Sequence, residues 1–274
     1  MRKSNKLFFY DLKYGIVKKI YRYIPIILIT FFYLIYMKYT IQNSLMPDNP
    51  SWGDYLLWMF YGMEPYIPEE RFIIPMAWLF MQVYIIMMVG NYAIHDLYGF
   101  GQQIMLRSKK RNYWWFSKCL YCVSTVLLYY IIINLIVFLY AIFSGAQLTL
   151  NTTQCVTCFM HSNDASLLSD NGWILSTFVL PVLTSCTFCF MQLALSFLIK
   201  PFYSYVAIIA IYIASLFYNT PLLIGNYSII ARNTVLKAGA TSFGIASISN
   251  IVIMLICVII GSIYIKKYNI IKSN

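Results

Sequence analysis

The sequence predicts an all-α integral membrane protein with six transmembrane helices, and three observations support this prediction. Of the 274 residues, 61% are hydrophobic and 11% are charged, whereas a soluble domain carries about a quarter charged residues. The mean hydropathy is +0.69. Continuous apolar runs of about 20 residues, the length of a membrane-crossing helix, recur along the chain and lack the alternation of a membrane β-barrel.

The first predicted element is an amphipathic helix at residues 1–22 that lies in the cytoplasmic interface of the membrane. Its apolar residues recur at three- and four-residue spacing, and most of its lysines lie on the other side. The apolar set is Leu7, Phe8, Leu12, Ile16 and Ile20. A basic leader that only sets membrane topology is the alternative interpretation.

The rest of the chain, residues 23–274, is predicted to form one six-helix transmembrane domain. The spans are expected at about residues 23–40, 72–94, 119–143, 173–199, 202–224 and 245–265. The first span is expected to be retained, because no small-residue cleavage site of a signal peptide follows it.

The distribution of lysine and arginine predicts that both termini are cytoplasmic, because these residues resist translocation. Cations gather before the first span, between the second and third spans, and after the sixth. By contrast, the charged residues of segment 41–71 are acidic except for Arg71, and residues 144–172 contain no Lys or Arg. We therefore expect a multi-pass protein of a bacterial plasma membrane.

Residues 104–118, IMLRSKKRNYWWFSK, combine cations with a run of four aromatic residues. Such a mixture can bind nucleic acid, but the apolar composition of the chain favours a membrane, so no nucleic-acid partner is expected. In a membrane protein, Tyr113, Trp114 and Trp115 are predicted to form an aromatic belt at the headgroup level. The neighbouring cations would face anionic lipid.

Several kinds of catalytic site are excluded or disfavoured. The chain has no phosphate-binding GxxxxGK[ST] motif, and its two histidines, His95 and His161, do not form an HExxH metal site. Glu69 and Glu70 resemble the glutamate pairs of intramembrane proteases, but they lie at a loop edge beside Arg71. The predicted span interiors contain no charged residue that would mark an ion pathway.

Cys155 and Cys158 form a CxxC pair in the predicted outer loop. Three alternatives stay open for this pair: a disulfide, a metal site completed by His161, or two free thiols.

The loop NYAIHDLYGFGQQIMLRSKKRNYWWFSK, residues 91–118, resembles the intracellular loop of bacterial ABC-2-type permeases, particularly small exporter or immunity permeases of Gram-positive bacteria. The resemblance is carried by Gly101, Arg107, Ser108, Lys110, Arg111, Trp115, Ser117 and Lys118. PLLIGNYSIIARN, residues 221–233, is similar to the segment that these permeases carry between spans five and six.

The resemblance implies partners: two copies of an ABC ATPase that bind ATP and Mg, and a second copy of the chain or a sister permease. This chain itself would bind no cofactor. A coupling helix at about Ile94 to Arg107 would enter a groove of the ATPase, and glycines would permit a tight turn beside it. The predicted contact residues are Asp96, Gly99, Gly101, Gln102, Gln103, Arg107, Ser108 and Arg111.

The resemblance also implies that residues 219–244 dip back into the bilayer, with Arg232 and Lys237 at the outer mouth; a plain external loop is the alternative. Neutral polar residues would line a cargo path or hydrogen-bond between helices. The predicted path residues are Gln82, Asn134, Gln192, Asn226 and Tyr227.

The expected function is that of the membrane subunit of an ATP-driven exporter for an amphipathic or apolar cargo, such as a peptide, a drug or a lipid. Peptide secretion and immunity against a bacteriocin both fit. Two alternatives from other classes are a membrane-embedded enzyme or protease, and a sensor or scaffold without transport.

Overall fold

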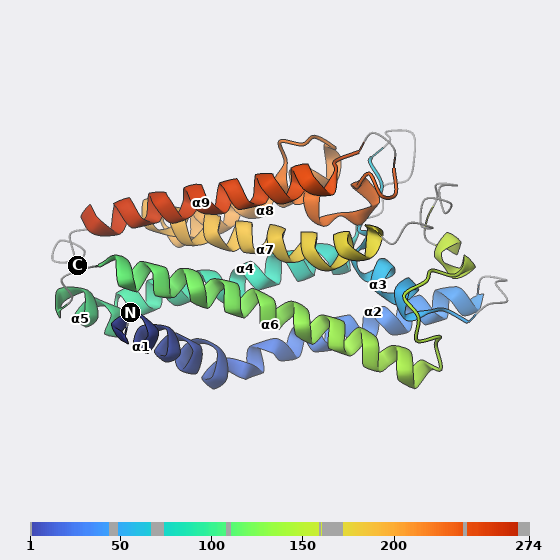
Figure 1. Ribbon diagram of the computed structural model, residues 1–274, viewed down its shortest axis with the longest axis horizontal. Coiled ribbons are helices and arrows are strands. Elements are labelled where there is room, and N and C mark those ends of the chain that lie inside the picture. Colours follow the sequence, from blue (N-terminus) through green and yellow to red (C-terminus); the bar gives the residue numbers. More distant parts are fainter. Residues whose placement is uncertain are drawn as a thin grey trace.

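The computed structural model describes residues 2–43, 49–66, 74–107, 111–158, 160, 172–237 and 240–267. Within these ranges the regular structure is helical, and the strand-type pairing is limited to isolated bridges. The long helices run side by side, and the start of α1 (Arg2–Asp11) and the last turns of α9 (Phe243–Lys267) lie at the same end of the bundle (Figure 1). We call this end the terminal end and the other the opposite end.

Five helical stretches of the described residues are long and apolar enough to cross a membrane. They are Lys6–Asn43, which contains α2 (Ile24–Asn43), then α4 (Met76–Leu97), α6 (Asn112–Ser144), α7 (Gly172–Leu198) and α9. A sixth apolar helix, α8 (Pro201–Phe217), is shorter. The structure thus confirms an all-helical chain with the character of a membrane protein. The predicted span at 202–224 differs, because its helix ends at Phe217.

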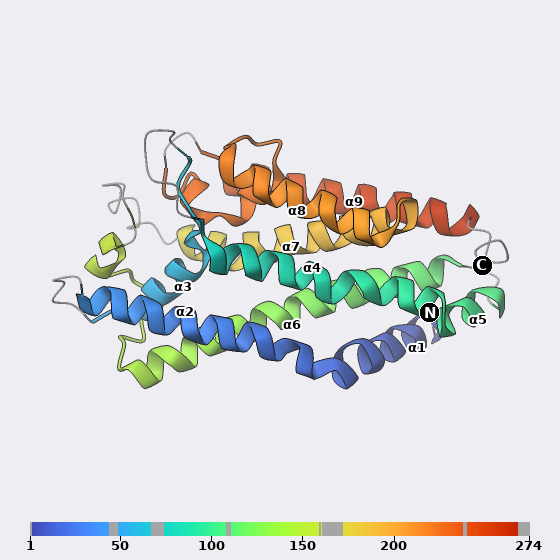
Figure 2. The same cartoon turned by 180° about the vertical axis from the view of Figure 1, so that it is seen from behind.

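The bundle is built around α7, which packs against α4, α6, α8 and α9. The outer helices expose apolar side chains: Phe32 on α2 is 63% exposed and Ile248 on α9 is 66% exposed. A contiguous surface of this kind is unfavourable in water and is expected where a helix faces lipid. Figure 2 shows α4 between α2 and α8 on one side of the bundle.

The predicted amphipathic helix at residues 1–22 is not one regular α-helix. After α1 the chain forms a π-helical turn, η1 (Leu12–Ile16), and a 3-10 segment, η2 (Val17–Tyr23). Gly15 packs against the ring of Tyr121, where a Cβ atom would collide with the ring. Lys19 has non-helical torsion angles, φ −117° and ψ 25°. The chain therefore bends between α1 and α2, as Figure 2 shows.

A helix that the sequence analysis did not predict, α3 (Trp52–Tyr61), forms in the segment expected to be an outer loop. A capping box starts this helix: Ser51 N donates to Asp54 Oδ2 at 2.8 Å, and Asp54 N donates to Ser51 Oγ at 3.1 Å. Asp54 also accepts hydrogen bonds from the amide and hydroxyl of Thr153. Burial raises the pKa of the Asp54 carboxyl, and these hydrogen bonds act in the opposite sense. Most of α3 is buried at the opposite end, against α2, α6 and α7.

Residues 219–244 contain the 3-10 segments η5 (Ile224–Ser228) and η6 (Ile230–Arg232). Arg232, predicted to lie at an outer mouth, is instead only 1% exposed. Its donors reach the carbonyl oxygens of Met63, Glu64, Ser215 and Leu216 and the side-chain oxygen of Asn226.

The guanidinium of Arg232 thus joins the chain after α3, the last turn of α8 and the η5 segment. Carbonyl oxygens in the last turn of a helix lack intrahelical donors, and a cation there is favourable. Burial lowers the pKa of Arg232 to about 10, so the side chain remains a cation at neutral pH. The opposite end is therefore closed by α3 and residues 224–232, with Arg232 between them.

Replacing Arg232 with Gln should destabilise the protein by about 3 kcal/mol or more, because buried carbonyl oxygens lose charged donors. Denaturation of the detergent-solubilised chain would measure this change. Lys237→Gln is the matched control, since Lys237 is exposed in the same segment. Equal stability of the two variants would contradict the assigned role of Arg232.

Candidate functional site

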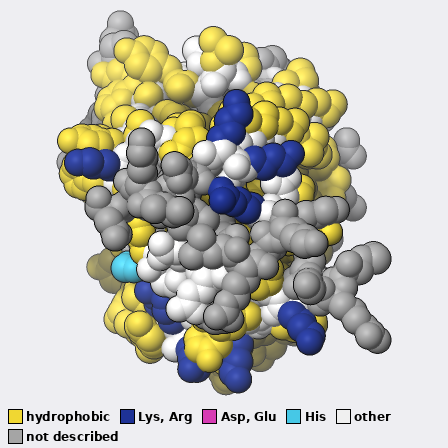
Figure 3. Space-filling model, turned by 90° about the vertical axis from the view of Figure 1, so that its left-hand side faces the viewer, with side chains coloured by type: hydrophobic (Ala, Val, Ile, Leu, Met, Phe, Trp, Pro, Cys, Tyr) yellow, Lys and Arg dark blue, Asp and Glu magenta, His cyan; other side chains and the backbone are white. Residues whose placement is uncertain are grey.

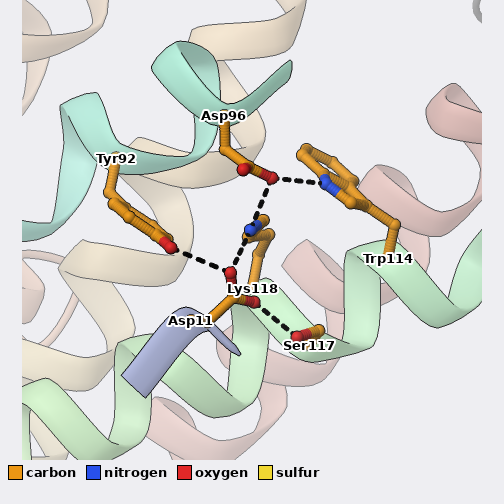
Figure 4. A network of polar contacts seen from close by, with 6 residues as sticks. All are labelled: Asp11, Tyr92, Asp96, Trp114, Ser117 and Lys118. Carbon is orange, nitrogen blue, oxygen red and sulfur yellow. Dashed lines mark hydrogen bonds and ion pairs between the residues drawn. The ribbon is translucent and has the colours of Figure 1, made fainter. Parts of the chain in front are cut away.

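The candidate functional site is a buried network of charged and polar side chains at the terminal end (Figure 4). Lys118 Nζ on α6 lies 2.5 Å from Asp11 Oδ1 and 2.7 Å from Asp96 Oδ2. Asp11 is the last residue of α1, and Asp96 lies in the last turn of α4. Lys118 is 1% exposed, so a single ammonium group connects three helices inside the protein.

Neighbouring donors complete the hydrogen bonds of the two carboxylates. Tyr92 OH donates to Asp11 Oδ1 at 2.9 Å, and Ser117 Oγ donates to Asp11 Oδ2 at 2.5 Å. Trp114 Nε1 donates to Asp96 Oδ2 at 2.8 Å. The ammonium group of Lys118 also lies 4.8 Å from the ring centre of Tyr92 and 5.3 Å from that of Trp114, distances at which a cation interacts favourably with an aromatic ring.

The network also determines the charge of the surface around it. Asp11 and Asp96, the acidic residues described at the terminal end, both contact Lys118; Asp11 is buried, and the side chain of Asp96 is only 8% exposed. The exposed basic residues there include Lys6, Lys13, Lys18, Lys200, Lys266 and Lys267. Figure 3, which views this end, accordingly shows Lys and Arg side chains and no Asp or Glu among the coloured residues. The described surface of this end is positive.

The short helix α5 (Phe100–Arg107) lies between α4 and α6 and rests on the network. The sequence analysis predicted one helix over Ile94–Arg107, but the chain breaks at a turn that contains Gly99. Gly101 lies inside α5 rather than in the turn. A Cβ atom there would collide with the backbone and carboxylate of Asp96 and with the indole nitrogen of Trp114. Glycine therefore lets α5 sit directly on two members of the network.

The predicted ATPase-contact residues have different environments. Asp96 points into the network, Gln102 and Arg111 are half-buried, and Gln103 is exposed. The side chain of Arg107 and all of Ser108 lie outside the described residues, so their predicted roles stay predictions.

The predicted aromatic belt is wrong for two of its three members. Trp114 and Trp115 are buried, whereas Tyr113 is exposed. Trp115 Nε1 donates to Val258 O on α9 at 3.0 Å, and the indole ring lies against Gly261, where a side chain would collide with it. These two tryptophans pack helices together instead of facing lipid headgroups.

The predicted cargo-path residues do not form one continuous set. Gln82 belongs to a closed hydrogen-bonded cluster with Tyr130, Ser185 and Tyr212 between α4, α6, α7 and α8. Asn134 donates to the backbone of Tyr130 at 2.8 Å. These contacts are the hydrogen bonds between and within helices that the sequence analysis gave as the alternative.

Asn226 and Tyr227 hold the turn after α8. Asn226 Nδ2 donates to the carbonyl oxygens of Tyr218 and Thr220, and Tyr227 OH donates to Pro221 O. Gln192 is fully buried, and its side chain and the Tyr205 hydroxyl both pack on α4 at Gly90. A cargo path through these residues remains a prediction.

The side chain of Cys158 and all of His161 lie outside the described residues, so the disulfide and metal alternatives stay open. Within the described ranges no cluster of three or more His, Cys, Asp or Glu residues is arranged to hold a metal ion.

The sequence analysis missed Asp11 and Tyr92 as site residues. The signal for Asp11 was its position as the lone acid in a basic segment beside Tyr10 and Leu12.

Replacing Lys118 with Met should destabilise the protein by about 3–5 kcal/mol, because two buried carboxylates lose their shared cation. Adding Asp11→Asn to Lys118→Met should cost little more or recover stability, which gives a coupling energy of about 2 kcal/mol in a double-mutant cycle. Denaturation in detergent would measure it, with Lys13→Met in the neighbouring exposed turn as the control. Strict additivity of the two changes would contradict the network.

Residues 62–271 of the chain match the family described as a protein of unknown function (DUF2705). No curated protein and no solved structure matches the chain. The family match runs from the end of α3 through α9, so it includes Asp96, Trp114 and Lys118 and leaves out Asp11. Since this match covers most of the chain, the protein belongs to the DUF2705 family.

Proposed function

We propose that this chain is the membrane-spanning subunit of an ATP-driven ABC exporter. In this proposal α2, α4, α6, α7, α8 and α9 are the six spans, and both termini are cytoplasmic. α8 has 17 residues, which gives a length of about 26 Å; that is at the lower limit for a membrane-crossing helix. The resemblance of residues 91–118 and 221–233 to ABC-2-type permeases supports the assignment.

The position of α5 is the observation that carries the proposal. This short helix lies at the terminal end between two long helices, and its Gly101 packs on Asp96 and Trp114. Asp96 in turn contacts Lys118, which contacts Asp11. A displacement of α5 would therefore be transmitted to α1, α4 and α6 together. This is the arrangement that a coupling helix needs when an ATPase pushes on it.

The opposite end suits the same mechanism. It is closed by α3 and residues 224–232, and Arg232 joins these segments to α8. In an exporter, cargo would leave at this end after the carbonyl groups of Met63 and Glu64 separate from Arg232. Rigid-body switching between two such packed states is a common mode of conformational change.

The proposal implies partners. Two ATPase subunits would bind ATP and Mg and dock at the positive terminal end, and a second copy of this chain or a sister permease would complete the membrane part. The cargo would be an amphipathic or apolar molecule, such as a peptide, a drug or a lipid. Burial of apolar surface would provide most of its binding free energy.

Gly101→Leu should prevent co-purification of the chain with the partner ATPase that the proposal implies, because the new side chain displaces α5 from Asp96 and Trp114. Gly244→Leu is the matched control, since a Cβ atom at Gly244 meets no neighbour. Both variants should still insert into the membrane. Stable ATPase binding by Gly101→Leu, or no ATPase binding by the unaltered chain, would contradict the proposal.

Single cysteines introduced at Gln103 and Leu222, in a chain whose natural cysteines are replaced, would test the orientation. Both positions are exposed, on α5 and at the opposite end respectively. A membrane-impermeant maleimide should label Leu222→Cys in intact cells and Gln103→Cys only after permeabilisation. Labelling of Gln103→Cys in intact cells would overturn the cytoplasmic placement of α5.

A further inference from the structure

The buried cysteines of the long helices form a group that the proposed exporter mechanism does not use. Cys119 and Cys122 lie on α6, Cys186 and Cys189 lie on α7, and Cys257 lies on α9. All five are buried free thiols. The two cysteines of each pair are three residues apart and therefore share one face of their helix. Because α6, α7 and α9 pack against one another, these faces bring thiols into the contacts between helices.

Two contacts determine how α6 and α7 lie against each other. Near the terminal end, the ring centres of Trp115 on α6 and Phe197 on α7 are 5.7 Å apart. Nearer the middle of the bundle, Tyr130 OH on α6 and Ser185 Oγ on α7 are 2.7 Å apart. The residue numbers increase along α6 and decrease along α7 between these two contacts. The helices are therefore antiparallel, and their relative register is known.

This register places Cys122 opposite Cys189. Cys122 is about two turns after Trp115, and Cys189 is about two turns before Phe197. The Tyr130 contact gives the same register, because this side chain points back toward the start of α6. The Cys122 thiol donates a hydrogen bond to the sulfur of Cys189, and both residues are 0% exposed. One thiol from each helix thus meets the other inside the bundle.

The number and kind of these ligands select a class of metal ion. Structural Zn²⁺ sites take four ligands, and iron–sulfur clusters are held by four residues. In the part of the chain that the structure describes, no group of three or more His, Cys, Asp or Glu residues is arranged to hold a metal. Soft ions such as Cu(I) and Ag(I) prefer sulfur ligands and accept two of them in a linear arrangement. A pair of thiols therefore fits a soft ion.

The burial of the pair favours an ion with a single positive charge. A monovalent cation bound by one thiolate and one thiol has no net charge, which avoids the cost of an unpaired charge in the interior. Binding breaks one S–H bond, releases its proton to solvent and forms two metal–sulfur bonds. No atom changes its oxidation state in this step.

We infer that Cys122 and Cys189 form a two-coordinate binding site for a soft monovalent metal ion of the Cu(I) class. The ion bridges the two sulfur atoms and thereby joins α6 to α7, the helix around which the bundle is built. Cys119 and Cys186 lie one turn away on the same helices and contribute no ligand. The site is independent of the proposed exporter, since neither an ATPase nor a cargo takes part in it.

The test uses the full chain in a neutral maltoside detergent, with Ag(I) as a redox-inert probe and N-acetylcysteine as a monothiol competitor. Native mass spectra should show one Ag(I) per chain that resists the competitor, because the second thiol of the same chain acts at a high effective concentration. The ion should also raise the unfolding temperature, since it binds the folded chain. Failure to retain an ion, or retention without stabilisation, would overturn the proposal.

Cys122→Ala and Cys189→Ala should each weaken Ag(I) binding about tenfold or more, and the double variant should lose no more ions than either single variant. Cys257→Ala is the matched control, because Cys257 is a buried thiol on α9 and the variant should keep the ion. Losses that add up in the double variant would show that separate thiols hold separate ions, which overturns the shared site. So would an equal loss in Cys257→Ala.

Cys122→Ser gives an independent measurement if an alanine variant fails to fold. This substitution keeps the size of the side chain but replaces a soft sulfur with a hard oxygen, so the ion should still be lost. Zn(II) should give no comparable protection, and equal protection by Zn(II) would indicate further ligands and overturn the two-thiol site. A disulfide between Cys122 and Cys189 in chain alkylated directly in cells would assign the pair to a redox cross-link and also overturn it.

Discussion

The arrangement of the terminal end depends on one lysine between two carboxylates. Lys118 lies within 2.7 Å of both Asp11 and Asp96 and is shielded from solvent. Removing any one of these buried charges leaves its partner without a counterion in a site shielded from water, which is strongly destabilising. α1, the end of α4 and the start of α6 therefore keep one relative position, and α5 rests on them through Gly101.

The opposite end is held by a different kind of contact. Arg232 binds backbone carbonyl oxygens and the side-chain oxygen of Asn226 instead of carboxylates, and it joins the chain after α3, the last turn of α8 and the η5 segment. The two ends thus have separate charged contacts. Lys118 connects α1, α4 and α6 beneath α5 at the terminal end, and Arg232 connects the segments after α3 and α8 at the opposite end. A change at one end need not break the contacts at the other.

The long helices could be predicted from composition and apolar run length alone, and these predictions lie within a few residues of the observed α4, α7 and α9. The helix α3 could not be predicted in this way, because its apolar run of ten residues is too short to span a membrane and lies in a segment whose charged residues are mostly acidic. Its capping box, Ser51 with Asp54, was the available signal. The short length of α8 was missed because apolar residues continue past Phe217 into an irregular segment.

The site was less predictable than the fold, since its contacts join distant parts of the chain. Nothing local pairs Asp11 with Lys118, and Trp115 is buried only because Gly261 on α9 leaves room for its ring. The resemblance to ABC-2-type permeases drew attention to residues 91–118, where α5 and all of the network residues except Asp11 lie. It did not indicate that Asp96 points inward.

Hydrogen–deuterium exchange on Lys118→Met, compared with the unaltered chain in the same detergent, tests most directly whether one buried lysine holds the terminal end together. The amides of α1 and α5 should lose protection together, while those of α3 and α8 keep theirs. Unchanged protection in α1 and α5, or a loss spread evenly over all helices, would contradict the central role of Lys118.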